Sequence, residues 1–268
     1  MPAGACDTHI HFYDPRVRVA ATSVLEPPPS SVSDYRRFRD SLGLRRCVVV
    51  QPTTYGMDNS CQLEAVAALG TDARAVVVVD STIPDAELDR LTQRGARGAR
   101  FHMLPGGAVD WGELDEVARR IALHGWHIQL QLNGRELAAR MPQLLRLPTP
   151  LVIDHIGRFM PPVSVDHGGF AALLGLVRSG NCWVKLSAPY ESSLAGPPRY
   201  EDLTPTVASL VSEVPDRLLW ASNWPHPGRE VPPDGAQLLG LLEAWIPEPA
   251  MRYRVLVENP VNLYGFAD

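Results

Sequence analysis

The chain has 268 residues, of which 45% are hydrophobic and 21% are charged, a composition typical of a globular protein with a sizeable core. Its formal net charge is −5, and no long basic run is present, so the sequence gives no electrostatic footprint for nucleic acid or an anionic membrane. No apolar stretch approaches the roughly 18 residues of a membrane span, and we therefore expect chemistry on small molecules.

The cysteines and the amino terminus favour a cytoplasmic protein. The cysteines are far apart in the sequence and form no CxxC pair, so we expect reduced thiols in or near the core. The amino terminus has no basic region followed by an apolar run, which is why we expect a cytoplasmic location. The cysteines are Cys6, Cys47, Cys61 and Cys182.

Short β-branched segments alternate with longer amphipathic segments from one end of the chain to the other. The predicted strands cover residues 5–12, 46–51, 73–79, 96–102, 127–132, 151–155, 183–187 and 218–222. The helices predicted after them cover residues 34–42, 58–69, 84–94, 111–124, 135–147, 170–177, 204–214 and 234–245. Eight strand–helix pairs predict a parallel sheet that closes on itself, an α/β fold of the (β/α)8 TIM-barrel class. An open doubly wound sheet would usually have fewer strands and a glycine-rich first turn, and the segment DTHIHFYDP has no glycine.

The connections after the strands are rich in proline and glycine, as in HMLPGG, MPPVS and HPGREVPP. We expect these segments at the carboxyl ends of the strands, where the loops of a barrel build active sites. No linker and no repeat beyond the strand–helix unit is visible. The length is typical of one barrel, so we expect a single domain over residues 1–268.

The first predicted strand carries two histidines one residue apart, in the sequence DTHIH. Because side chains alternate along a strand, we expect Asp7, His9 and His11 to share one face. Two imidazoles that point to the same place are either part of a catalytic or metal-binding site or structural polar residues satisfied by hydrogen bonds.

Polar residues at the ends of the other predicted strands favour the first of these alternatives. The carboxyl ends of all strands meet at one mouth of a barrel, so we expect these side chains to converge on a small-molecule site. They are Gln51 after the second strand, Arg100 and His102 on the fourth, Gln129 and Gln131 on the fifth, His155 on the sixth, Lys185 and Ser187 on the seventh with Tyr190 after it, and Asn223 and His226 after the eighth.

Together these segments resemble the amidohydrolase superfamily, in the branch that includes 2-pyrone-4,6-dicarboxylate lactonase. The similar segments are DTHIH, DNSC, GARGARFH, DHIGR, VKLSAPY, SNWPHP and ENPVNLYGF, which extend over nearly the whole chain. The resemblance implies a distorted (β/α)8 barrel that hydrolyses a small lactone without a metal, with His9, His11 and His155 as active-site histidines. It also implies that Arg100 and Arg158 hold carboxylate or carbonyl groups of the substrate.

The sequence departs from the superfamily pattern at positions that concern the metal and the substrate. The superfamily has an Asp after the last strand where this chain has Asn223, and a neutral amide cannot act as a carboxylate base, although it can orient a water. The fifth strand offers Gln129 and Gln131 in place of ligands, and amides bind zinc poorly. The segments MLPGG and PYESS, with Glu191, are less basic than in the lactonase, so we expect a substrate that is less anionic than a dicarboxylate.

The histidines leave two alternatives for a cofactor. His9, His11 and His155 can in principle hold one Zn²⁺ with water as the fourth ligand. A cation normally also gains a carboxylate, and the position that should supply it is Asn223. We therefore expect catalysis without a cofactor and keep a single zinc ion as the alternative.

The expected reaction needs a base and an oxyanion site. Water must lose a proton as it adds to the lactone carbonyl, and His155 or His226 has an ordinary pKa, about 6.5, that suits this task. Our hypothesis gives the role of base to His155, while Asn223 positions the water. The groups expected to receive the negative charge of the oxyanion are His9, His11 and either Arg100 or Arg158.

Several of these residues also have structural interpretations. Arg158 can form a surface ion pair, and Lys185 can neutralise a buried carboxylate such as Asp7. The loop residues Gln51, Tyr190 and His226 can simply pack.

Three other functions remain open from the sequence. The same site can isomerise a sugar lactone by moving an acyl group between hydroxyls, or belong to a zinc-dependent hydrolase or decarboxylase. Asn223 also leaves open a barrel that binds a metabolite without catalysis. The expected partner is a small molecule, and the sequence does not determine the oligomeric state.

Overall fold

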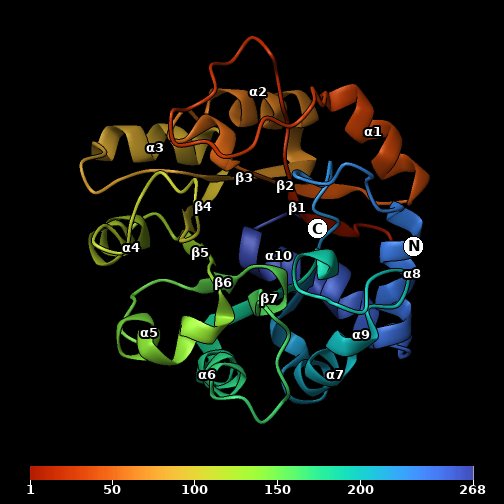
Figure 1. Cartoon of the computed structure of the whole chain (residues 1–268). Helices are drawn as coiled ribbons and strands as arrows, with labels where there is room; N and C mark the ends of the chain where they lie inside the picture. Colours follow the sequence, from red (N-terminus) through yellow and green to blue (C-terminus); the bar gives the residue numbers. More distant parts are fainter. Residues whose placement is uncertain (268) are drawn as a thin grey trace.

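The structure, a computed structural model, describes residues 1–267 and contains a sheet of eight strands whose spatial order follows the chain (Figure 1). All seven neighbouring pairs are parallel. The residues after the last strand complete the ring, because the Asn223 N–H donates to the His9 carbonyl at 3.0 Å and the His11 N–H donates to the Trp224 carbonyl at 2.9 Å. The predicted (β/α)8 barrel is confirmed. Its strands are β1 (Cys6–Ile10), β2 (Arg46–Val50), β3 (Ala73–Val77), β4 (Ala96–His102), β5 (His127–Gln131), β6 (Leu151–Ile153), β7 (Cys182–Leu186) and β8 (Leu218–Trp220).

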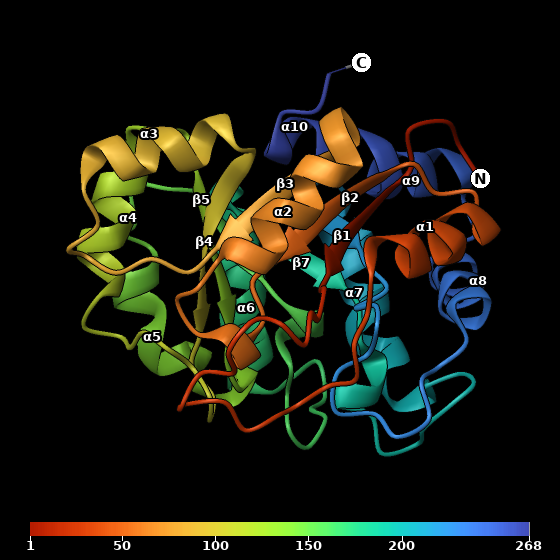
Figure 2. The same ribbon diagram turned by 90° about the horizontal axis from the view of Figure 1, so that it is seen from above.

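Helices surround the strands on the outside of the barrel (Figure 1). Figure 2 shows the long connections after β1, β7 and β8 on one side of the barrel and both chain termini on the opposite side. The main helices are α1 (Val32–Ser41), α2 (Ser60–Leu69), α3 (Asp85–Gln93), α4 (Leu114–Ala122), α5 (Leu137–Leu144), α6 (Gly168–Leu176), α7 (Thr204–Glu213) and α8 (Gly235–Trp245), followed by the short α9 (Pro249–Tyr253) and α10 (Asn259–Tyr264).

Strand alternation produces two apolar cores. Side chains such as Val49 and Ile128 belong to the large cluster between the strands and the helices. Residues on the other face of the strands, such as Val48 and Val152, belong to a second cluster that Tyr264 and Phe266 join. Apolar side chains therefore fill the barrel at the end opposite the loops, and the polar inward residues are left for the other end.

Most strands are shorter than the sequence predicts. Only β4 has the predicted bounds, and β6 ends at Ile153, so His155 lies beyond the strand in a turn over His155–Gly157. His155 has φ 54°, a left-handed conformation that a strand does not contain. The strands stop pairing where the backbone turns to present polar side chains.

The prediction that Asp7 shares a face with His9 and His11 is wrong. The register of β1 against β2 shifts between Asp7 and Ile10, and such an irregularity moves the residues beyond it relative to the residues before it. The Asp7 carboxylate accepts hydrogen bonds from the backbone N–H and the hydroxyl of Ser222, at 2.9 and 2.5 Å.

The four cysteines are buried and unpaired. Within residues 1–267, no helix combines the length and the apolar character that crossing a membrane requires.

Candidate active site

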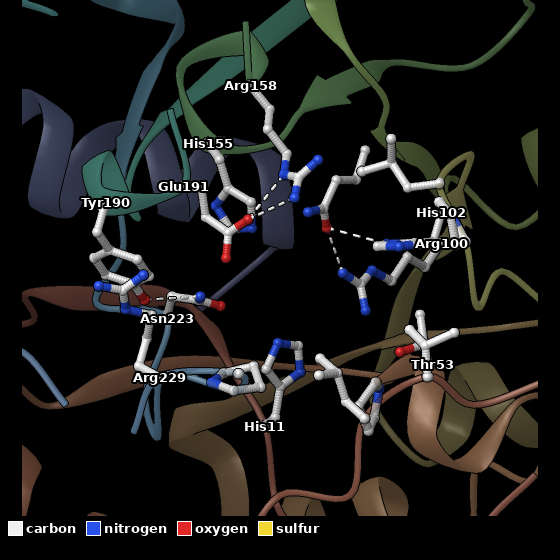
Figure 3. A pocket seen from close by; sticks show the side chains of 18 of the residues that line it. His11, Thr53, Arg100, His102, His155, Arg158, Tyr190, Glu191, Asn223 and Arg229 are labelled. Atoms are coloured by element: carbon white, nitrogen blue, oxygen red, sulfur yellow. Dashed lines mark hydrogen bonds and ion pairs between the residues drawn. The ribbon is translucent and has the colours of Figure 1, made fainter. Parts of the chain in front are cut away.

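A cavity of about 750 Å³ opens at the carboxyl ends of the strands, a volume that suits a small-molecule site. Figure 3 shows side chains from several strands and from the loops after them pointing into it. Eight of the residues predicted for the site line the cavity: His11, Arg100, His102, Gln131, His155, Arg158, Tyr190 and Asn223.

The other six predicted site residues are not part of the wall. They are buried behind it or beside it, where they contact residues that line the cavity or support them. Gln51, for example, donates to the carbonyl groups of Gly56 and Asp58, which fixes the loop after β2. The six are His9, Gln51, Gln129, Lys185, Ser187 and His226.

His9 and His11 form a hydrogen-bonded pair, with 3.2 Å between their Nε2 atoms. His11 Nδ1 lies 2.7 Å from the Val50 carbonyl oxygen, which can only accept, so Nδ1 carries the proton and Nε2 accepts from His9. Burial and the nearby Arg100 lower the pKa of His11 to about 3. Burial also holds the pKa of His9 well below its ordinary value. Both imidazoles are therefore neutral at pH 7.

Asp154 is a buried part of this network that the sequence analysis missed. Its Oδ1 lies 3.3 Å from His9 Nδ1 and 3.5 Å from Lys185 Nζ, and its Oδ2 accepts from Gln129 at 3.1 Å. Burial alone would raise the pKa of Asp154, but the adjacent His9 ring and the Lys185 ammonium favour its charged form and hold the pKa well below its ordinary value. Strand alternation from Val152, an inward residue of β6, would have identified it.

Lys185 pairs with Asp154, so the alternative in which it neutralises Asp7 is wrong. Within 4.0 Å, its one carboxylate partner among residues 1–267 is Asp154. Burial lowers the pKa of Lys185 to about 8. The pKa of Asp7 is raised to about 6, because burial outweighs the hydrogen bonds from Ser222.

Arg100 is a buried cation that has no carboxylate partner in the described part of the chain. Its guanidinium donates to the Gln51 carbonyl at 2.6 Å and to Gln131 Oε1 at 2.7 Å, and its Nε is unpartnered. Burial lowers the pKa of Arg100. His102 donates to the same Gln131 oxygen at 3.3 Å, and burial lowers the pKa of His102 to about 3.

Arg158 forms an ion pair, but at the wall of the cavity rather than on the outer surface. Its Nη2 lies 2.8 Å from Glu191 Oε2, and the two side chains are 17% and 20% exposed. Figure 3 shows this pair across the cavity from Arg100 and His102. Glu191 thus neutralises the arginine that the sequence analysis assigned to substrate binding.

His155 faces the cavity, and one of its ring nitrogens is hydrogen-bonded to a residue behind the cavity wall. Its Nδ1 lies 2.9 Å from Ser187 Oγ, which leaves Nε2 available to a ligand. Burial lowers the pKa of His155 and that of His226 to about 4, below the ordinary value of about 6.5.

Asn223, Tyr190 and His226 form a hydrogen-bonded chain beside the cavity. Asn223 Nδ2 donates to Tyr190 Oη at 3.0 Å, and Oη donates to His226 Nδ1 at 3.0 Å. Asn223 has φ 63°, a conformation that asparagine tolerates better than most residues. Its Oδ1 is buried and finds no hydrogen-bond partner up to residue 267, so the chain of hydrogen bonds presents an acceptor to the cavity.

Further residues of the cavity lie on the loops and were not predicted from the sequence. Their positions carry no strand alternation, and only the folded loops bring them to the cavity. Arg229, exposed at the rim, lies with its guanidinium carbon 5.3 Å from the centre of the Tyr190 ring. Thr53 is a second residue of this kind, whereas Tyr13 and Asn133, which also line the cavity, continue the alternation beyond His11 and Gln131.

Among residues 1–267, the side chains that could jointly bind a metal are His9, Asp154 and His155, whose ligand atoms lie within 4.8 Å of one another. Asp154 thus takes the place that the sequence analysis gave to His11. The residues do not fit a divalent cation, because the Lys185 ammonium already contacts His9 at 3.3 Å and Asp154 at 3.5 Å. A metal ion on these ligands would lie beside the buried ammonium of Lys185, and the two positive charges would repel each other.

Comparisons with known proteins agree with this architecture. A D-galactarolactone isomerase from Agrobacterium fabrum is 37% identical, over 98% of this chain and 92% of the relative. A 2-pyrone-4,6-dicarboxylate hydrolase from Comamonas testosteroni is 36% identical, over 98% of this chain and 91% of the relative. A 4-sulfomuconolactone hydrolase from Hydrogenophaga intermedia is 33% identical, over 99% of this chain and 90% of the relative.

A solved structure and a family model cover the same range. An apo crystal structure from Agrobacterium tumefaciens superimposes with a TM-score of 0.93 at 37% identity, covering 99% of this chain and 97% of the other. The family model described as Amidohydrolase matches residues 6–266. The resemblance seen in the sequence is confirmed, and the chain belongs to the amidohydrolase family.

Proposed function

We propose that the chain is a lactonase: it opens the ring of a small lactone by adding water at the carboxyl-end cavity, without a metal. The observation that carries the proposal is the convergence of His11, Arg100 and His155 on one cavity from β1, β4 and the turn after β6. An ester carbonyl becomes an oxyanion when a nucleophile adds. The buried guanidinium of Arg100, which no carboxylate of residues 1–267 neutralises within 4.0 Å, suits that charge.

His155 is the proposed general base. When its Nδ1–H donates to Ser187 Oγ, Nε2 carries a lone pair that can accept the proton of the attacking water. With its pKa lowered to about 4, His155 is neutral at pH 7 and ready to accept a proton, although it is a weaker base than an ordinary histidine.

The charges of the cavity favour a substrate with less negative charge than a dicarboxylate. Glu191 neutralises Arg158, so Arg100 and the rim residue Arg229 are left to attract an anion. The amide and hydroxyl groups of Gln131, Asn223 and Thr53 suit a lactone that also carries hydroxyl groups.

A second candidate function is the isomerisation of a hydroxy-acid lactone, and Asn223 favours it. The free Oδ1 of Asn223 accepts a hydrogen bond but cannot take a proton, so it orients a hydroxyl nucleophile without activating it. A hydroxyl of the substrate itself needs less activation than water because it is already held near the carbonyl. The relative named as a D-galactarolactone isomerase supports this candidate.

One experiment separates the two functions. A panel of sugar-acid and muconate-type lactones is incubated with the protein in ¹⁸O-labelled water, with a pH indicator and NMR of the products. Hydrolysis releases one proton and incorporates the label, whereas isomerisation changes the ring size and does neither. A panel in which ligands bind but none is converted would contradict both proposals and favour a non-catalytic barrel.

Metal independence is tested separately. We expect purified protein to hold no stoichiometric zinc and its turnover to be unchanged by a chelator, because Lys185 lies against the candidate ligands and Asn223 supplies no carboxylate. Stoichiometric zinc with chelator-sensitive turnover would favour a zinc-dependent hydrolase or decarboxylase. The cytoplasmic location stays a prediction.

A further inference from the structure

Lys185 places its ammonium group at the centre of the barrel, behind the wall of the cavity. Nζ donates to Gln129 Oε1 at 2.7 Å and to the Thr8 carbonyl at 2.9 Å. The third N–H faces His9 Nδ1 at 3.3 Å and Asp154 Oδ1 at 3.5 Å. All three donors of the ammonium are therefore used, and the Lys185 and Asp154 side chains are both 0% exposed.

The composition of the chain indicates that this position needs an ammonium in particular. Lys185 is the only lysine of the sequence, and every other member of the 25 lysines and arginines is an arginine. An ammonium is a compact point charge with three donors, whereas a guanidinium is a flat fork with five. The groups around Nζ come from three separate parts of the barrel, β1, β5 and the residue after β6, at distances of 2.7 to 3.5 Å.

The same ammonium contacts two of the three side chains that could bind a metal. A divalent cation would need the lone pair of His9 and an oxygen of Asp154, and both already face a positive charge. The negative charge of Asp154, which would compensate such a cation, is balanced by Lys185.

The ammonium also contacts the nitrogen of His9 that carries the lone pair. Lys185 Nζ and Gln129 Nε2 both approach His9 Nδ1 at 3.3 Å. The Val50 carbonyl requires the proton on His11 Nδ1, so His11 Nε2 accepts from His9, and neutral His9 carries its proton on Nε2 and its lone pair on Nδ1. That proton then points to His11 Nε2 at 3.2 Å. The two donors stabilise the lone pair beside Asp154 Oδ1, which also lies 3.3 Å from Nδ1.

We infer that Lys185 is a built-in cation that takes the place of a metal ion in this barrel. It neutralises Asp154, stabilises the lone pair on His9 Nδ1, and keeps divalent cations away from His9, Asp154 and His155. Lys185 is a positioning residue, since it does not line the cavity. The inference is independent of whether the cavity hydrolyses or isomerises a lactone.

The test is zinc binding, measured with zinc chloride by equilibrium dialysis and elemental analysis. We expect wild type to bind no stoichiometric zinc. Lys185→Leu removes the cation without adding a ligand, and we expect it to bind one zinc per chain at least about 10-fold more tightly than wild type. The double variant Lys185→Leu/Asp154→Asn should lose this zinc. A matched control, Gln129→Leu, changes a neutral neighbour of the same residues and should gain none.

A folded Lys185→Leu variant that gains no zinc would overturn the inference, and so would equal gains in Lys185→Leu and Gln129→Leu. If Lys185→Leu does not fold, the inference is tested on the wild-type protein by NMR. Lysine labelled with ¹³C at Cε gives a single NMR signal, because the chain has one lysine. We expect zinc chloride to leave this signal unchanged, whereas a saturable shift at one zinc per chain would show that a metal enters beside Nζ. Neither readout depends on lactone turnover.

Discussion

At the scale of single residues, the neighbours Asp154 and His155 serve different parts of the site. Asp154 continues the inward alternation of β6 and points to His9, 3.3 Å away. His155 and Ile156 have φ 54° and 57°, and this left-handed turn sends the His155 ring into the cavity instead. Sparsely populated backbone conformations of this kind often occur at functional sites, and here the conformation presents a neutral imidazole to the ligand.

Replacement of His155 tests its role as a base. We expect His155→Ala to lower kcat by at least about 100-fold on a lactone that the wild type converts, in the range typical of acid–base groups. The control is His124→Ala, whose ring lies near the surface beside Asp89, outside the cavity. Turnover of His155→Ala close to that of wild type would remove this residue from the mechanism.

The lowered pKa of His155 predicts the acid limb of the activity profile. The base acts in its unprotonated form, so kcat/KM should be constant as pH falls from 7 to 5 and then decrease with a midpoint near the His155 pKa of about 4. Rates are measured in the first seconds after a jump from neutral pH, so that acid unfolding does not contribute. A decrease centred near 6.5 would mean that the catalytic base is an ordinary, solvated histidine.

At the scale of elements, close packing between neighbouring strands limits the size of the side chain at some strand positions. Gly98 of β4 pairs with His127 of β5, and the His127 ring packs edge to face on Tyr264, with 5.3 Å between ring centres. A Cβ on Gly98 would lie 2.5 Å from atoms of the His127 ring. Glycine at this position therefore makes room for an inward side chain of the neighbouring strand.

We expect Gly98→Ala to lower the free energy of unfolding by about 1–3 kcal/mol, the usual cost of overpacking a core. The matched control is Gly240→Ala in α8, where a Cβ meets no neighbouring atom within 4 Å; it should raise stability by up to about 1 kcal/mol through helix propensity. Both values come from denaturant unfolding at pH 7. Equal effects of the two substitutions would contradict the contact with His127.

At the scale of the whole molecule, the barrel encloses several histidines in their neutral form. Burial lowers the pKa of each of them, because the charged form loses its hydration in the interior. The pKa values are about 3 for His11, His102 and His127, and about 4 for His155 and His226.

These histidines predict that the protein loses stability in mild acid. In the unfolded chain they bind protons below about pH 6.5, while in the folded chain they stay neutral to pH 3–4. Unfolding therefore takes up protons, and each histidine reduces the free energy of unfolding by about 1.4 kcal/mol for each pH unit below 6.5. Asp7 has the opposite effect on the free energy of unfolding between about pH 4 and 6, because its pKa is raised to about 6. This single group offsets only part of the effect of the histidines.

The measurement is the free energy of unfolding from denaturant titrations between pH 7.5 and 4.5. We expect it to be nearly constant above pH 6.5 and to decrease progressively below. A value that stays constant down to pH 4.5 would contradict the burial of neutral histidines.

The sequence by itself determined the architecture and the membership in the family. Eight short β-branched segments, each followed by an amphipathic segment, predicted the barrel, because this number of strand–helix pairs forms a parallel sheet that closes on itself. Side-chain alternation along the strands predicted that Arg100, His102 and Gln131 line the cavity. The segments DHIGR and SNWPHP predicted the same for His155 and Asn223.

Only the tertiary structure decided which polar groups meet. The irregularity in β1 separates Asp7 from His9, and a shift of one residue exchanges the faces of a strand. Lys185 of β7 consequently pairs with Asp154, which follows the adjacent strand β6, and not with Asp7. Alternation fixes the side to which a residue points, but the partner, the burial and hence the pKa depend on the register and curvature of neighbouring strands, which no single segment encodes.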